Sequence, residues 1–187
     1  MVVNIPIFLT ILRIALIPIF VVVFYLPVDW ANIVTTTIFG LAALTDWFDG
    51  YLARRWQQTS AFGAFLDPVA DKLIVAVALV FLVQQHPSPW LAIPAAVIIG
   101  REITISALRE WMAELGQRTQ VAVTKVGKVK TVAQMTALLM LLYGKSFLNI
   151  PIYEIGYLSL YIAAALTLWS MFIYLQAALP ILRKDPR

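Results

Sequence analysis

Long apolar stretches dominate the sequence and restrict the folds that the chain can adopt. Six of them have the roughly 17 to 25 residues that an α-helix needs to cross a bilayer. The chain of 187 residues is 61% hydrophobic and only 13% charged, which lies outside the range of soluble proteins. Helices are therefore expected over about residues 5–26, 32–55, 66–85, 89–112, 128–146 and 152–178. The sequence predicts an all-α integral membrane protein: a bundle of six transmembrane helices forming a single domain over residues 1–187.

The distribution of basic residues indicates how this bundle is oriented. Arg and Lys follow the second, fourth and sixth spans, whereas the turns around Pro27 and His86 contain neither. Because positively charged loops remain in the cytoplasm, both termini are expected there, with Lys145 as the one basic residue on the other side. The net charge of +4 is thus explained by topology, and no nucleic-acid partner is expected.

Cysteine and targeting signals are both missing from the sequence. The lack of cysteine excludes disulfides, thiolate metal sites and Cys nucleophiles. No Lys or Arg precedes the first apolar stretch and no small-residue cleavage motif follows it, so we expect the first span to be retained. The only histidine, His86, falls in a non-cytoplasmic turn and is predicted to be an ordinary loop residue.

Four aspartates gather near the expected cytoplasmic ends of the second and third spans: Asp46, Asp49, Asp67 and Asp71. Helical spacing puts the first two on one face and the last two on another, and a short connector turns the helices antiparallel. Facing carboxylates repel one another or take up protons unless cations lie between them. Oxygen ligands without His or Cys favour Mg²⁺ or Mn²⁺ over Zn²⁺, and two such ions would suit phosphoryl transfer at a diphosphate.

Small and basic residues follow the first two acids. Gly50 and Ala53 would let a ligand approach the helix closely, and Arg54 would bind a phosphate unless it serves only as a topology anchor. The alternative for the acids themselves is a set of salt bridges to Arg54, Arg55 and Lys72. Such pairing needs no common face and leaves the spacing of Gly50 and Ala53 unexplained, so a metal site is the preferred hypothesis.

The string DWFDGYLARRWQQTSAFGAFLDPVAD fits the pattern D-x2-D-G-x2-A-R-x8-G-x3-D-x3-D. On these residues the chain resembles the CDP-alcohol phosphotransferases, which implies a six-helix bundle with a cytoplasm-facing site and a homodimer. The resemblance also implies that the four aspartates ligate two divalent cations and that Asp71 doubles as the catalytic general base. The residues that would line the pocket for the CDP group are Gly50, Ala53, Arg54 and Gly63.

A second polar cluster concerns the acceptor. In REITISALRE, Arg101 and Arg109 are eight residues apart, which places them roughly on one helical face. Glu102 and Glu110 are the alternative partners, but each is adjacent to its Arg and is expected to point elsewhere. The stretch KVGKVKT adds Lys125, Lys128 and Lys130. A phosphate-bearing alcohol would satisfy both basic groups.

REITISALRE, GKVKT and the opening NIPIFLTILRI look like the phosphatidylglycerophosphate synthase branch of the same family. This resemblance implies CDP-diacylglycerol as donor, sn-glycerol 3-phosphate as acceptor, CMP as leaving group and a bacterial inner membrane location. Related chains often read N-I-P-N at the opening, whereas Ile7 stands last here. Asn4, Thr10 and Arg13 are further polar candidates near the cytoplasmic face, with a helix cap as the alternative for Asn4.

Other classes of protein share part of this sequence pattern. Intramembrane prenyltransferases also bind a diphosphate through paired aspartates, but they typically have more helices and DDxxD-like motifs. A divalent-cation transporter would need polar residues near the middle of several spans, whereas these acids gather at one end. Synthases that use inositol phosphate or make cardiolipin remain possible within the family, and REITISALRE argues against them.

Overall fold

The structure is a computed structural model that describes residues 5–56, 61–114, 125–146 and 149–182. Six helices hold almost all of these residues: α1 (Ile5–Phe24), α2 (Ala31–Trp56), α3 (Ala61–Gln85), α4 (Pro89–Glu114), α5 (Lys125–Tyr143) and α6 (Ile152–Leu182). No β-strand occurs within the described ranges. The prediction of an all-helical chain with six helices is therefore confirmed.

Several helix boundaries differ from the prediction by a few residues, among them the start of α3 and the end of α5. The sequence predicts that the third helix begins at about residue 66 and that the fifth ends at about residue 146. The third helix instead begins at Ala61 and continues through Pro68, which packed neighbouring helices can tolerate. The fifth helix ends at Tyr143 because Gly144 adopts a φ of 64° and its N–H donates to the carbonyl of Met140 at 3.2 Å.

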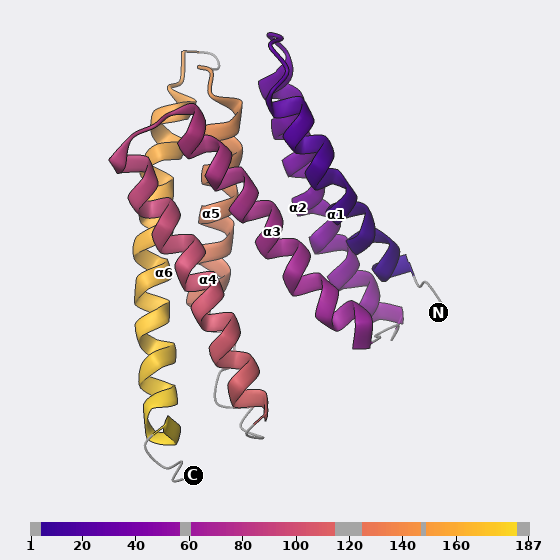
Figure 1. The fold of residues 1–187 in the computed structure, drawn as a ribbon, viewed down its shortest axis with the longest axis vertical. Helices are drawn as coiled ribbons and strands as arrows, with labels where there is room; N and C mark the ends of the chain where they lie inside the picture. Colours follow the sequence, from indigo (N-terminus) through magenta and orange to yellow (C-terminus); the bar gives the residue numbers. More distant parts are fainter. Residues whose placement is uncertain (1–4, 57–60, 115–124, 147–148, 183–187) are drawn as a thin grey trace.

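Two antiparallel pairs of helices, α1 with α2 and α5 with α6, lie on either side of α3, which crosses between them (Figure 1). α1 packs on α2 and α5 packs on α6, while α3 contacts both α1 and α4. α4 also packs on α6, and α2 reaches α5. One buried core contains residues from every helix, including Phe20, Phe39, Leu79, Ile98, Leu138 and Leu160. The site described below is therefore held between helices that share this core.

The outer surface of the bundle is apolar. Val22, Trp90, Leu158 and Trp169 are each more than 60% exposed. Among the described residues, three stretches are long and apolar enough to cross a membrane: Ile7–Phe24, Pro89–Glu114 and Ile152–Gln176. α2, α3 and α5 carry charged residues near one end, and their spanning the bilayer stays a prediction.

Candidate active site

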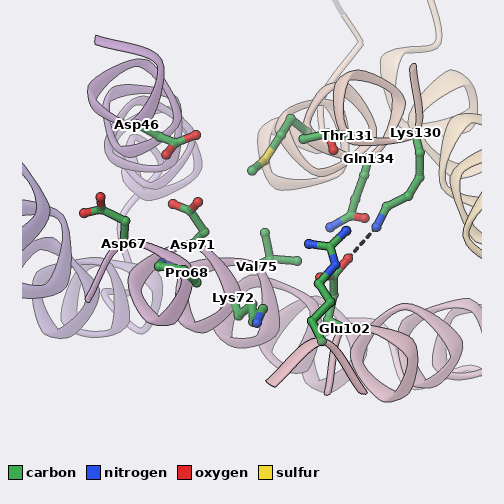
Figure 2. Close-up of a pocket in the computed structure, with 12 residues that line it drawn as sticks. Asp46, Asp67, Pro68, Asp71, Lys72, Val75, Glu102, Lys130, Thr131 and Gln134 are labelled. Atoms are coloured by element: carbon green, nitrogen blue, oxygen red, sulfur yellow. Dashed lines mark hydrogen bonds and ion pairs between the residues drawn. The ribbon is translucent and has the colours of Figure 1, made fainter. Parts of the chain in front are cut away.

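A cavity of about 350 Å³ lies between α2, α3, α4 and α5. Its walls include three of the four predicted acids, Asp46, Asp67 and Asp71, together with Lys72, Glu102, Arg109, Lys130, Thr131 and Gln134. Figure 2 shows the three aspartates at one end and the Glu102–Lys130 pair at the other. Residues far apart in sequence thus give the cavity an acidic end and a basic end.

The acidic end also contains two residues of α1. Arg13 is fully buried, and its Nη1 lies 3.2 Å from Oδ1 of Asp46 while also pairing with Asp71. Thr10, one turn before Arg13, donates its hydroxyl to Asp67. The side chains of Asp46 and Asp71 remain 42% and 38% exposed, so both still reach the cavity.

Among the described side chains, the cation that pairs with Asp46 and Asp71 is Arg13 of α1, and the side chains of Arg54 and Arg55 lie outside the described part of the structure. The salt-bridge alternative drawn from the sequence names Arg54, Arg55 and Lys72, but Lys72 instead donates to the hydroxyl of Ser106 on α4. Sequence reasoning named Thr10 and Arg13 only as polar candidates. The available signal was an Arg within the first apolar span, which demands an anionic partner.

The acidic end fits a hard cation in its donor chemistry. Every acidic side chain there offers oxygen, the donor that Mg²⁺ and Mn²⁺ prefer. Within the described part of the site, the three carboxylates outnumber the two cations near them, Arg13 and Lys72. Among the described side chains, however, no three acidic or imidazole groups converge as a complete ligand set. The side chain of Asp49, the fourth predicted ligand, lies outside the described part of the structure.

The residues predicted to contact the CDP group are only partly described. For Gly50, Ala53 and Arg54 the structure describes the helical backbone of α2 and nothing beyond it. Gly63 is buried near the start of α3.

The opening motif is also only partly described. Ile7 is buried in α1 with 4% exposure. Asn4 lies outside the described residues.

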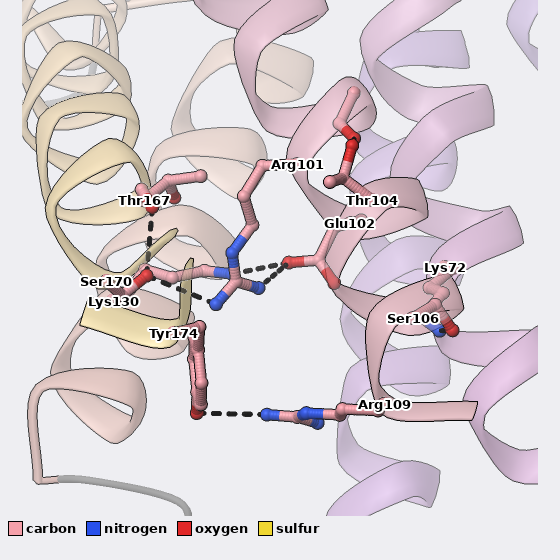
Figure 3. Close-up of polar contacts among 11 residues, drawn as sticks. Lys72, Arg101, Glu102, Thr104, Ser106, Arg109, Lys130, Thr167, Ser170 and Tyr174 are labelled. Atoms are coloured by element: carbon pink, nitrogen blue, oxygen red, sulfur yellow. Dashed lines mark hydrogen bonds and ion pairs between the residues drawn. The ribbon is translucent and has the colours of Figure 1, made fainter. Parts of the chain in front are cut away.

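At the basic end, Glu102 joins two buried cations. Its Oε1 accepts a hydrogen bond from Nη1 of Arg101 at 2.9 Å and also pairs with Lys130 of α5 (Figure 3). Arg101 and Lys130 are only 7% and 4% exposed. The expectation that Glu102 points away from Arg101 is therefore wrong. Adjacency along the helix does not prevent contact, because the long Arg side chain bends back to its neighbour.

Arg101 and Arg109 do share one side of α4. Nη2 of Arg109 donates to the hydroxyl of Tyr174 on α6 at 3.0 Å, and the Cζ atoms of Arg101 and Arg109 lie 5.8 and 5.2 Å from the centroid of the same Tyr174 ring. Arg109 is exposed and lines the cavity. The side chains of Lys125 and Lys128, in the first turn of α5, lie outside the described part of the structure.

Sequence reasoning missed three polar residues of α6. Ser170 accepts a hydrogen bond from Nη2 of Arg101 at 3.1 Å, and Tyr174 holds Arg109. Thr167, Ser170 and Tyr174 recur at helical spacing in the C-terminal half of a mostly apolar helix, which was the available signal. His86 lies at the opposite end of α3 against the ring of Tyr153, away from this network.

The sequence is similar to known proteins along almost its whole length. Residues 3–169 match the family described as CDP-alcohol phosphatidyltransferase. A protein of Pectobacterium atrosepticum is 60% identical over 175 residues, and one of Salmonella typhimurium is 59% identical over the same length. A Sodalis glossinidius protein is 58% identical, and in all three cases 94% of both chains is covered. Each relative is named CDP-diacylglycerol--glycerol-3-phosphate 3-phosphatidyltransferase.

Proposed function

The chain belongs to the CDP-alcohol phosphatidyltransferase family, and we propose that it transfers the phosphatidyl group of CDP-diacylglycerol to sn-glycerol 3-phosphate. The products are CMP and phosphatidylglycerophosphate, an intermediate of phospholipid synthesis. The observation that carries this proposal is one cavity with carboxylates at one end and the cations Arg109 and Lys130 at the other. The names of the relatives, which contain both substrates, support the choice of donor and acceptor.

The acidic end would bind the nucleotide diphosphate. Two divalent cations, Mg²⁺ or Mn²⁺, would be held by Asp46, Asp49, Asp67 and Asp71. When bound, such ions neutralise the charge that builds on a diphosphate during transfer. The CDP group would lie against Gly50, Ala53, Arg54 and Gly63, where small side chains allow close approach and the guanidinium binds phosphate.

Asp71 is the proposed general base. Its carboxylate borders the cavity and is partly exposed, so an acceptor hydroxyl can reach it. Asp71 accepts the proton of that hydroxyl, and the oxygen attacks the phosphorus that carries the diacylglycerol. The bond from this phosphorus to the CMP oxygen then breaks. The ion pair with Arg13 would orient the carboxylate for this transfer.

The basic end would bind the phosphate of the acceptor. Arg109 and Lys130 line the cavity, and Arg101 contacts the same Glu102 as Lys130. Lys125 and Lys128 are assigned to the same phosphate from their positions in the sequence. Planar guanidinium groups bind phosphate oxygens in pairs, and this geometry would hold the glycerol hydroxyl toward Asp71.

The proposed enzyme spans the bacterial inner membrane six times, with both termini and the cavity facing the cytoplasm. The alternation of basic and non-basic connections supports this orientation, and the relatives compared above are bacterial. The resemblance to the family supports a homodimer.

The test is a comparison of acceptors. Purified protein with CDP-diacylglycerol and Mg²⁺ should release CMP with glycerol 3-phosphate and little with glycerol, serine or inositol. A preference for an unphosphorylated alcohol would overturn the acceptor assignment. Release with myo-inositol phosphate or phosphatidylglycerol in place of glycerol 3-phosphate would move the enzyme to another branch of the family.

A further inference from the structure

Two polar residues of α6 hold the two arginines of α4. Ser170 binds Arg101 and Tyr174 binds Arg109, with one turn between the α6 residues and about two turns between the arginines. Both α6 residues lie beyond residue 169, where the match to the family ends. We propose that Ser170 and Tyr174 are positioning residues that orient Arg101 and Arg109 toward the acceptor phosphate, an inference that rests on the proposed function.

Ser170 is arranged to accept rather than to donate toward Arg101. Its own hydroxyl proton goes to the carbonyl of Thr167 at 2.9 Å, which leaves the oxygen lone pairs for Nη2 of Arg101 at 3.1 Å. Oε1 of Glu102 accepts a hydrogen bond from Nη1 of the same guanidinium. The buried Arg101 is thus held from two directions, and its plane is fixed before any ligand arrives.

Tyr174 restrains the more exposed arginine. Its ring is 6% exposed and lies under both guanidinium groups, while its hydroxyl accepts from Nη2 of Arg109. A free Arg side chain loses considerable rotamer entropy when it binds a ligand. The cation–π contact and the hydrogen bond remove part of that loss in advance. The Arg109 side chain is therefore already oriented when the phosphate binds.

The charges of the network indicate which ligand it accepts. Among the described side chains, three cations of the network, Arg101, Arg109 and Lys130, accompany one carboxylate, that of Glu102. The excess positive charge matches a phosphate monoester, which carries about −1.5 to −2 near neutral pH, better than a phosphodiester or carboxylate. The network therefore favours an acceptor with a terminal phosphate.

Tyr174→Phe tests the role of the hydroxyl, because it keeps the ring and its packing. We expect the KM for glycerol 3-phosphate to rise roughly tenfold, the effect of one lost hydrogen bond to a charged group, with the KM for CDP-diacylglycerol unchanged. Ser170→Ala should act in the same direction through Arg101. The matched control is Tyr161→Phe, since Tyr161 lies on the same helix and donates to the carbonyl of Trp90 at 2.7 Å, away from the cavity. Equal effects of Tyr174→Phe and Tyr161→Phe on the acceptor KM would overturn the inference.

A double-mutant cycle separates positioning from general packing. In an Arg109→Ala background, Tyr174→Phe should no longer change the acceptor KM, because the side chain it orients is gone. If the two effects simply add, Tyr174 does not act through Arg109 and the inference fails.

Phosphate binding provides a readout that does not depend on turnover. Inorganic phosphate should raise the melting temperature of the wild-type protein more than that of Tyr174→Phe. If the wild type turns over no glycerol 3-phosphate yet shows this difference, the proposed acceptor is wrong and the positioning role stands. Equal stabilisation of both proteins, or of neither, would overturn the positioning role.

Discussion

At the scale of single residues, Arg13 determines the electrostatics of the acidic end. It is a fully buried cation on α1 that pairs with Asp46 on α2 and Asp71 on α3. An uncompensated buried charge is costly, so the arginine needs these anionic partners, and the acids that face one another need a cation between them. The proposed divalent cations would compensate the same carboxylates, which makes the contribution of Arg13 to stability depend on metal.

Arg13→Met should therefore destabilise the protein most when metal is removed. Breaking a buried pair costs about 3–5 kcal/mol, and the partial exposure of both acids reduces this to about 1–3 kcal/mol. Thermal unfolding of the purified protein in EDTA should show the full loss, and added Mg²⁺ should recover much of it. Arg13→Lys, which keeps a cation, is the control. An equal loss of stability with and without Mg²⁺ would contradict the account of this cluster.

Asp71→Asn tests the proposed general base. The amide keeps an oxygen that can accept from Arg13 but cannot take a proton from the acceptor hydroxyl. Turnover should fall by a factor of about 10² to 10⁴, measured as CMP release at saturating substrates. Asp29→Asn, in the turn between α1 and α2, should leave turnover unchanged. Near-normal activity of the Asp71 variant would remove its role as base.

The sequence indicates candidate acids and basic residues more readily than it indicates their partners. Charged residues are costly in a membrane span, so Asp46, Asp67 and Asp71 stand out in the sequence, and the structure places all three at one cavity. Partners such as Arg13 and Tyr174 depend on which helices approach one another and on how long side chains bend. Glu102 illustrates this, because spacing along α4 argued against a contact that the Arg101 side chain nevertheless makes.

At the scale of the helices, a glycine controls how closely α5 and α6 approach. A Cβ added at Gly156 would lie 2.7 Å from Cβ of Met140 and 3.2 Å from the backbone nitrogen of Leu141. Backbone atoms and a Cβ have little freedom to move, so any side chain there forces the helices apart. The lengths of the apolar runs predicted these two helices, but this close approach required the structure.

Gly156→Ala should accordingly destabilise the bundle. Overpacking a well-packed interface costs about 1–3 kcal/mol, which a lowered melting temperature would report. The matched control is Gly100→Ala on α4, where an added Cβ meets no atom within 4 Å. That variant should be neutral or slightly stabilising, since Ala favours helix over Gly. A Gly156 variant as stable as the Gly100 variant would show that the two helices can separate without cost.

At the scale of the whole molecule, one cavity is built from four helices that follow one another in the chain. Its wall is formed by α2, α3, α4 and α5. Residues of α1 contact the acids at one end, and residues of α6 contact the arginines at the other. Length and hydropathy predicted the number of helices, and the Asp motif predicted that α2 and α3 meet. The contacts of α1 with α3 and of α4 with α6 could not be predicted, because apolar faces of membrane helices carry little information about their partners.

The orientation of this molecule in the membrane can be tested directly, because the chain contains no cysteine. Single cysteines at Asp29 and at His86 should react with a membrane-impermeant maleimide in intact spheroplasts. A cysteine at Glu114, the last residue of α4, should react only after permeabilisation. The expected pattern follows from the positive-inside rule. Labelling of the Glu114 position from outside would reverse the proposed topology and move the cavity out of the cytoplasm.

The division of the cavity into a donor end and an acceptor end is tested most directly by two-substrate kinetics of Arg109→Ala. This side chain is exposed and lines the basic end, so its removal should leave the fold intact, and Glu110→Ala on the same helix is the control. We predict that the KM for glycerol 3-phosphate rises roughly tenfold or more while the KM for CDP-diacylglycerol stays within about twofold of the wild type. An equal rise in both KM values would contradict the account, because it would place Arg109 at the nucleotide rather than at the acceptor phosphate.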